Sequence, residues 1–178
     1  LKGRKDALKA AVHMVHALEG LMADETDTVR FTVGRFECHP GSPSTVPSRV
    51  LFTIDFRHPD PAVIERIRLN IEPVCQARAR GCAVSVRPTI ESAPLQFDPA
   101  LIDMVEDYAA RLGHSVMRLP SGAGHDAGHI NHLCPTGMIF VPCERGISHN
   151  EAENATPADL AAGARTLAAC LVDLANQE

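Results

Sequence analysis

Apolar residues recur at helical spacing near the start of the chain, in residues 5–22. Positions three or four apart share one face of an α-helix, so a helix is predicted here. A second helix is predicted over residues 61–80, kinked at Pro73, because proline lacks a backbone donor and clashes with the preceding turn. Gly81 is predicted to end it. The predicted buried face of the first helix carries Leu8, Val12, Val15, Leu18 and Met22.

Alternating apolar and polar residues predict three strands in the same part of the chain. Residues 29–38 change phase around Gly34, as a β-bulge would cause. Residues 82–90 form the third predicted strand. The order helix, strand, strand, helix, strand resembles a ferredoxin-like α+β sandwich without its first strand. In the cleanest strand, residues 48–57, one face carries Val50, Phe52, Ile54 and Phe56, and the other carries Arg49, Thr53, Asp55 and Arg57.

The second part of the chain follows a predicted linker, residues 91–99, which has two prolines and no periodicity. Asp98 is predicted to cap a helix that Gly113 ends. Short apolar strands with both faces buried are predicted at 115–119 and 138–141, on either side of a helix beginning near Gly124. The final helix is predicted from Thr156 to about residue 176. The inner face of the helix after Asp98 is predicted to carry Leu101, Ile102, Val105, Tyr108 and Leu112. Helices alternating with strands indicate the α/β class.

Composition narrows the range of partners. The net charge is −5 and there is no block of Lys or Arg, which argues against nucleic acid and against an anionic membrane surface. No apolar stretch approaches the roughly 20 residues that span a bilayer, and the first ten residues are too charged for a secretion signal, so we expect a soluble, cytoplasmic protein. The six cysteines form no C-x-x-C pair, which favours reduced thiols in the core.

A glycine-rich turn leads into a predicted helix within SGAGHDAGHINH, residues 121–132. Free backbone N–H groups at such a helix start can bind a carboxylate or an oxyanion. His125, His129 and His132 would share a face of this helix, yet solvent-exposed histidines are a better interpretation than a metal site. His58-Pro59-Asp60 matches an H-x-D metal motif formally, but its position between a strand and a helix favours a structural role.

His149 lies in GISHNEAE, directly after the apolar run MIFVP. Ligands of α/β sheets gather at the carboxyl ends of strands, and a neutral imidazole is a good zinc ligand. One histidine without a visible partner is by itself more often a solvated loop residue.

Four segments together resemble a known family: VPSRVLFTIDFRHPD, SGAGHDA, PTGMIF and GISHNEAE. In their order and spacing they are similar to zinc-dependent amidohydrolases of the hydantoinase/carbamoylase family, which act on N-carbamoyl-L-amino acids, allantoate and ureido acids. The resemblance implies an aminopeptidase-like catalytic domain with an inserted lid and dimerisation domain. Residues 1–92 would be part of the lid, and residues 93–178 the C-terminal part of the catalytic domain. The chain would then be a fragment of a longer enzyme.

The resemblance also assigns roles to single residues. His149 matches a ligand of one of two metal ions, Zn²⁺ or otherwise Mn²⁺, Co²⁺ or Ni²⁺. Arg57 matches the lid arginine that binds the substrate carboxylate in the partner subunit, and Gly124 matches a glycine whose backbone contacts substrate. Ser44 stands where the family has an asparagine that assists Arg57. No catalytic residue is expected in the chain, because the general-base glutamate and the lid histidine would precede Leu1.

The predicted function is therefore metal-dependent hydrolysis of a linear amide or ureido C–N bond in a small anionic substrate, by a homodimer that binds neither nucleic acid nor membrane. These 178 residues alone are predicted to be inactive. Two alternatives stay open. One is a non-catalytic dimerisation or ligand-binding module, and the other is an aminoacylase or dipeptidase of the same clan.

Overall fold

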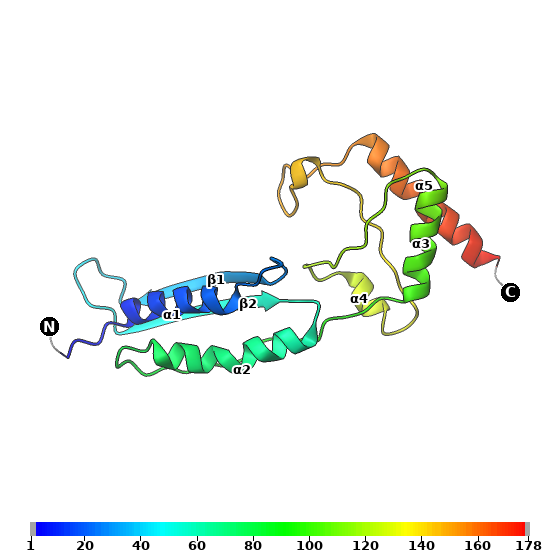
Figure 1. Cartoon of the computed structure of the whole chain (residues 1–178). Helices are drawn as coiled ribbons and strands as arrows, with labels where there is room; N and C mark the ends of the chain where they lie inside the picture. Colours follow the sequence, from blue (N-terminus) through cyan, green and yellow to red (C-terminus); the bar gives the residue numbers. More distant parts are fainter. Residues whose placement is uncertain (1–2, 177–178) are drawn as a thin grey trace. The chain divides into compact units, whose positions relative to one another are not determined.

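The computed structural model describes residues 3–176. The chain divides into two compact units, Leu1–Pro94 and Leu95–Glu178, and each is described by itself (Figure 1). The first unit combines two long helices with a hairpin, whereas the described residues of the second unit form helices and no strand.

The first unit opens with α1, Ala7–Met22, whose N-terminus is capped by Asp6 through a 3.1 Å hydrogen bond from the Lys9 amide. The predicted buried face was partly wrong, since Val12 is 54% exposed. Small residues, Ala10 and Ala11, are buried in this helix, and a prediction based on large apolar side chains does not include them. The residues that are actually buried are Ala10, Ala11, Met14, Leu18 and Met22.

An antiparallel hairpin packs against α1. It consists of β1, Arg30–His39, and β2, Arg49–Arg57. The register shifts between Val33 and Arg35, which confirms the bulge predicted at Gly34. The faces of β2 are also confirmed, because half-buried and exposed residues alternate along its whole length.

The second helix of this unit, α2, spans Pro61–Ala77 and includes Pro73, as predicted. Asp60 caps it by accepting a 2.8 Å hydrogen bond from the Ala62 amide, and the Asp60 amide donates to His58 Nδ1 at 3.0 Å. Asp60 and His58 are thus occupied at the helix start, which confirms the structural interpretation of His58-Pro59-Asp60. Ile67, Ile71 and Cys75 of α2 are buried in one cluster with α1.

The predicted strand at residues 82–90 does not form a ladder with any described strand. Its first residues do alternate, and Cys82 and Val84 pack against the core while Ile90 is 89% exposed. Alternation shows that a segment can lie on a core with one face, but strand pairing needs a neighbour with free backbone groups. Within residues 3–176 the sheet has only two strands.

The second unit contains α3, Pro99–Arg111, α4, Asp126–Ile130, a 3₁₀ turn at Glu144–Gly146, and α5, Pro157–Ala175. Asp98 caps α3 by accepting from the amides of residues 100 and 101. Thr156 caps α5 by accepting from the Asp159 amide at 3.1 Å. Both caps and the glycine stop after α3, with φ +79° at Gly113, confirm the predictions.

The two buried strands predicted in this unit were wrong. Residues 115–119 and 138–141 are extended but belong to no sheet among the described residues, and Met117 and Phe140 are 76% and 49% exposed. Leu112, predicted to face inward, is 41% exposed. Within residues 3–176, no other element covers the apolar side chains of Leu112, Met117 and Phe140 completely.

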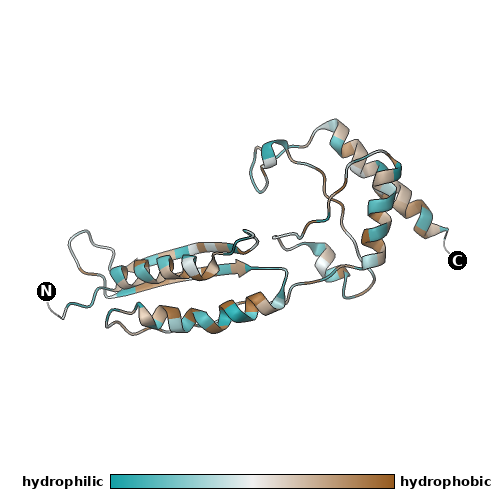
Figure 2. Cartoon of the chain, in the orientation of Figure 1, coloured by the Kyte–Doolittle hydropathy of each residue, from teal (hydrophilic) through white to brown (hydrophobic). Residues whose placement is uncertain are grey.

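Exposed apolar side chains also run along α5, at Leu160, Leu167, Leu171 and Val172, which are 50–64% exposed. Figure 2 shows hydrophobic residues on both α3 and α5. Contiguous exposed apolar surface usually marks an interaction site. No helix within residues 3–176 is long and apolar enough to cross a membrane.

The six cysteines are all free thiols, as predicted. Cys75 and Cys170 are buried, and burial raises the pKa of both thiols. Cys134 is exposed and does not fit the expected core position.

Asp24 organises the connection between α1 and β1, because its carboxylate accepts from the amides of Thr28 and Val29 at 3.0 Å each. These backbone hydrogen bonds lower the pKa of Asp24 below its ordinary value of 3.8. A depressed carboxyl pKa gives stability that is present above the ordinary value and is lost as the pH falls below it. Asp24→Asn is expected to reduce the loss of stability of the first unit below about pH 4.

Denaturant unfolding followed by circular dichroism between pH 2 and 6 measures this difference. Asp27→Asn serves as the control, because no carboxylate contact of Asp27 is recorded and asparagine tolerates its left-handed backbone, φ +50°. Equal pH dependence in the Asp24→Asn variant and the unmodified chain would contradict the prediction.

Candidate functional site

His149 lies in a loop that is closed at its base. The Glu144 amide donates a hydrogen bond to the Asn154 carbonyl at 2.7 Å, so the residues between them form a closed loop. Three residues in it have left-handed backbones: Arg145 at φ +57°, Gly146 at +69° and His149 at +56°. Left-handed conformations at residues other than glycine cost energy and gather at functional sites, so the loop merits a functional hypothesis.

Glu153 holds the backbone at His149. Its Oε2 accepts from the His149 amide at 2.8 Å, and its Oε1 lies 3.9 Å from the Cys143 thiol, which donates to it. Asn150 stabilises the same loop, because its side-chain oxygen accepts a hydrogen bond from the Ala152 amide at 2.9 Å. This role of Glu153 was not predicted from the sequence. The signal for it was an acid four residues after a histidine inside a loop.

The imidazole of His149 is left available. The residue is exposed, and within residues 3–176 only its backbone amide takes part in a recorded hydrogen bond. The loop therefore fixes the backbone, and the ring has no recorded hydrogen-bond partner within residues 3–176. Such a ring can serve as one ligand of a metal ion.

Removing the Glu153 carboxylate should make the backbone at His149 more mobile. Glu153→Ala is expected to speed amide hydrogen exchange at His149 by about tenfold, since a hydrogen bond to a charged acceptor contributes about 1.5 kcal/mol. NMR-detected exchange measures it. Glu151→Ala is the matched control, because Glu151 is exposed and no contact of its side chain is recorded in the described part of the chain. Similar exchange rates in the two variants would show that Glu153 does not hold this backbone.

The other histidines do not form a metal centre. His125, His129 and His132 were expected to share a helical face, but α4 has only five residues, with His125 as its extended N-cap and His132 beyond its end. The expected shared helical face was therefore wrong. Among the described residues, no group of three or more His, Cys, Asp or Glu side chains could hold a metal ion.

Gly124 lies in a turn that its neighbours stabilise. Ser121 Oγ and His125 Nε2 are 2.7 Å apart, and the Ala123 amide donates to Ser121 Oγ at 3.2 Å. The His125 ring also meets the edge of Phe140, with 5.5 Å between ring centroids. A side chain at Gly124 would meet nothing within 4 Å, so packing inside the chain does not require glycine there. The open space permits close approach of a ligand to the backbone.

Arg57 ends β2 on its outer face and is paired with Asp55, two residues earlier on the same face. Arg57 Nε and Nη2 donate to the two carboxylate oxygens at 2.8 and 2.9 Å. The side-chain hydrogen bonds raise the pKa of Arg57 and lower the pKa of Asp55. This bidentate geometry is the one in which arginine binds carboxylates in general.

Ser44 lies far from Arg57. It is an exposed residue of the connection between β1 and β2, next to the end where His39 pairs with Arg49, whereas Arg57 pairs with Arg30 at the other end (Figure 1). Nine residues of β2 separate these ends, a distance of roughly 27 Å at strand rise. One copy of the hairpin therefore does not bring Ser44 and Arg57 to the same carboxylate.

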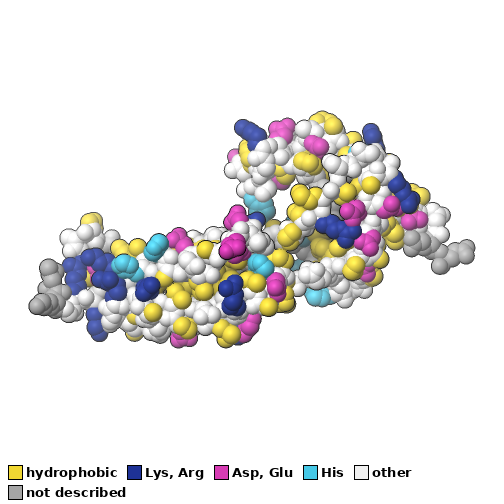
Figure 3. Space-filling model, viewed as in Figure 1, with side chains coloured by type: hydrophobic (Ala, Val, Ile, Leu, Met, Phe, Trp, Pro, Cys, Tyr) yellow, Lys and Arg dark blue, Asp and Glu magenta, His cyan; other side chains and the backbone are white. Residues whose placement is uncertain are grey.

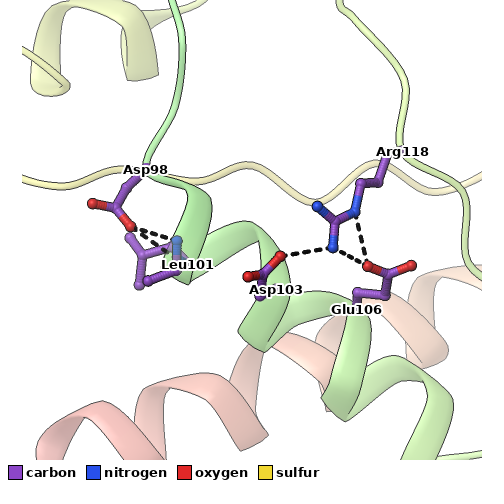
Figure 4. A network of polar contacts seen from close by, with 6 residues as sticks. Asp98, Leu101, Asp103, Glu106 and Arg118 are labelled. Carbon is purple, nitrogen blue, oxygen red and sulfur yellow. Dashed lines mark hydrogen bonds and ion pairs between the residues drawn. The ribbon is translucent and has the colours of Figure 1, made fainter.

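Arg118 joins an extended segment to α3 (Figure 4). Its Nε donates to Glu106 Oε2 at 2.8 Å and its Nη2 donates to Asp103 Oδ1 at 2.7 Å. Hydrogen bonds to Glu106 and then Asp103 raise the pKa of Arg118. This network was not predicted from the sequence. An arginine inside a strand predicted to be buried was a signal for it, because a buried charge requires partners.

Comparison with known proteins places this arrangement in a family. A family model described as peptidase family M20/M25/M40 matches residues 2–173. The chain belongs to this peptidase family. The M20/M25/M40 match covers both units, so the resemblance drawn from the four sequence motifs is confirmed at the level of the family.

Individual relatives of this M20/M25/M40 chain are amidohydrolases. An N-carbamoyl-L-amino-acid amidohydrolase of Rhizobium meliloti is 39% identical over 148 residues, which is 81% of this chain and 35% of the relative. An allantoate amidohydrolase of Escherichia coli K12 is 33% identical over 181 residues, 98% of this chain and 43% of the relative. The chain thus spans less than half the length of the curated relatives that it matches.

Solved structures agree with the family assignment. A hydantoinase/carbamoylase family amidase from Burkholderia multivorans matches with a TM-score of 0.89 and 37% identity, over 97% of this chain and 43% of that one. A second such amidase, from Burkholderia vietnamiensis, matches with a TM-score of 0.85 and 39% identity, over 96% and 42%.

Proposed function

We propose that this M20/M25/M40 chain is part of a metal-dependent amidohydrolase that cleaves a linear amide or ureido C–N bond in an N-carbamoyl amino acid or an allantoate-like acid. The relatives named as N-carbamoyl-L-amino-acid and allantoate amidohydrolases support this class of reaction. The observation within the chain that carries the proposal is His149, an exposed imidazole on a loop whose backbone Glu153 fixes. In this proposal residues 1–92 belong to a lid and dimerisation domain and residues 93–178 to the catalytic domain.

The residues present fit a shared metal site in part. His149 supplies one nitrogen ligand, and no cluster among residues 3–176 supplies a complete set. We propose that the remaining ligands and the general base come from polypeptide beyond these 178 residues. A bound divalent cation polarises the scissile carbonyl and makes water a stronger acid. Glu153 holds the backbone of His149, and a ring nitrogen remains able to bind a metal ion.

Arg57 is proposed to bind the substrate carboxylate of a partner subunit. Its guanidinium lies on the outer face of β2 and already holds one carboxylate, that of Asp55, in bidentate geometry. A substrate carboxylate would share or replace this partner. Because Ser44 lies at the opposite end of β2, any contribution of Ser44 to a substrate contacted by Arg57 requires a second copy of the chain.

The turn around Gly124 is proposed to contact substrate through its backbone. The Ser121–His125 hydrogen bond closes the turn, and the open space beside Gly124 leaves room for a ligand. Backbone N–H groups at the start of a helix favour oxyanions and carboxylates.

The exposed apolar surface of the second unit also supports the proposal that this unit is only part of a catalytic domain. Leu160, Leu167 and Leu171 on α5 and Met117 in the extended segment are at least half exposed. A surface of this kind is normally covered by protein. In the proposal, the rest of the catalytic domain covers it.

A direct test uses a chimera in which this chain replaces the matching 43% of the Escherichia coli allantoate amidohydrolase. The isolated 178-residue chain is expected to hydrolyse nothing in the presence of zinc or manganese. The chimera is expected to hydrolyse N-carbamoyl amino acids or allantoate in preference to N-acetyl amino acids, measured as ammonia or amine release.

Thermal unfolding and metal analysis establish beforehand that the chimera is folded and loaded. A folded, metal-loaded chimera that hydrolyses neither ureido substrate would contradict the proposal, as would hydrolysis by the isolated chain. Preference for N-acetyl amino acids would favour an aminoacylase instead.

A further inference from the structure

A groove of about 680 Å³ runs between α1 and α2 of the first unit. Its apolar lining consists of small or apolar residues, namely Ala17, Gly20, Val74 and Ala77. Its polar lining consists of two imidazoles, His13 and His16, and two guanidinium groups, Arg78 and Arg80. Among the described residues, no Asp or Glu lines the groove.

The two arginines of this groove lack the ion pairs that six other arginines form among the described residues. Arg4, Arg35, Arg68 and Arg111 each form an ion pair with a nearby acid, as do Arg57 and Arg118. In contrast, no ion pair or side-chain hydrogen bond involves Arg78 or Arg80 within residues 3–176. His13 is likewise without a recorded partner there, whereas His16 lies 3.3 Å from Glu19.

Positive charge gathers at this end of the unit although the whole chain carries a net charge of −5. Figure 3 shows Lys and Arg side chains grouped where α1 begins. The end of α2 lies at the same place, because a side chain at Gly81 would meet the Lys5 side chain at 3.7 Å. A groove lined by one sign of charge concentrates anions from solution.

We propose that this groove binds a phosphate monoester with an apolar substituent. Arg78 and Arg80 would donate to the phosphate oxygens, since the planar guanidinium matches phosphate in bidentate geometry. His13 would add a further donor. The apolar substituent would lie along Ala17, Gly20 and Val74, and the volume is in the range of small-molecule sites, roughly 300–1,000 Å³.

The test is an NMR titration of the ¹⁵N-labelled 178-residue chain with phenyl phosphate at physiological salt. Shifts are expected at His13, Gly20, Arg78 and Arg80, and Arg78→Ala/Arg80→Ala is expected to weaken affinity at least about tenfold. Arg66→Ala/Arg87→Ala is the matched control, because it removes the same charge from two other exposed arginines of this unit that have no recorded ion pair. It is expected to change affinity less than about twofold, since charges beyond the Debye length are screened.

A second variant tests whether the apolar lining of the groove contacts the ligand. Gly20→Leu is expected to block binding while leaving the arginines intact, because the new side chain would enter open space in the groove. Inorganic phosphate is expected to bind more weakly than phenyl phosphate. The proposal is overturned by equal affinity for inorganic phosphate, by equal weakening in the two double-arginine variants, or by absence of shifts at the groove.

Discussion

Gly163→Ala is expected to lower the free energy of unfolding of the second unit by about 1–3 kcal/mol. A Cβ at residue 163 would lie 2.6 Å from Cγ1 of Val141, which is closer than carbon atoms can approach. Valine is stiff at χ1, so it does not turn aside easily, and the extended segment that carries it would have to move away from α5. This loss exceeds the gain of about 0.5–1 kcal/mol that alanine brings to a helix interior. Chemical denaturation followed by circular dichroism measures the difference.

Gly20→Ala is the matched control, because Gly20 lies inside α1 and its added Cβ would meet nothing within 4 Å. It is expected to stabilise the first unit by up to about 1 kcal/mol. Adding Val141→Ala to Gly163→Ala should recover part of the loss, since the two side chains compete for one space. Stabilisation by Gly163→Ala of the same size as by Gly20→Ala would show that α5 does not pack against Val141 in this way.

His149→Ala in the chimera is expected to lower amide hydrolysis by at least about a hundredfold and to lower the metal content. The expectation follows from the proposed role of the exposed imidazole as a metal ligand, whose loss leaves the site one nitrogen short. Steady-state kinetics gives the first quantity, and metal analysis of the dialysed protein gives the second.

His129→Ala is the control, because His129 is also exposed and lies on the short α4 helix. It is expected to leave activity and metal content within about twofold of the parent, as for most surface substitutions. Full metal content in the His149→Ala chimera would refute the ligand role, even if activity fell for another reason.

Local features of the fold were predictable because they depend on neighbours in sequence. Asp60, Asp98 and Thr156 are each followed by Pro at the first helical position, and all three cap helices. The two faces of β2 and the bulge at Gly34 also follow from period and phase. Each depends on hydrogen bonds or packing within a few residues.

Long-range pairing was not predictable in the same way. Residues 82–90, 115–119 and 138–141 have the composition of strands, yet none belongs to a sheet among the described residues. Composition shows a tendency to be extended, whereas a ladder needs a second segment with free backbone groups at the right distance. On α1, the alanines that allow close packing were overlooked for the same reason, since only the packed partner shows which face is buried.

The residues of the candidate site were chosen from the sequence, whereas their contacts became known only from the structure. The sequence by itself determined the family, through four separated motifs, and with it the choice of His149, Arg57, Gly124 and Ser44. Only the tertiary structure decided that Glu153 fixes the His149 backbone, that Arg118 ties an extended segment to α3, and that Ser44 and Arg57 lie at opposite ends of one strand. Motifs record which residue types stand at which positions, but hydrogen bonds and distances between side chains are set by how the backbone folds.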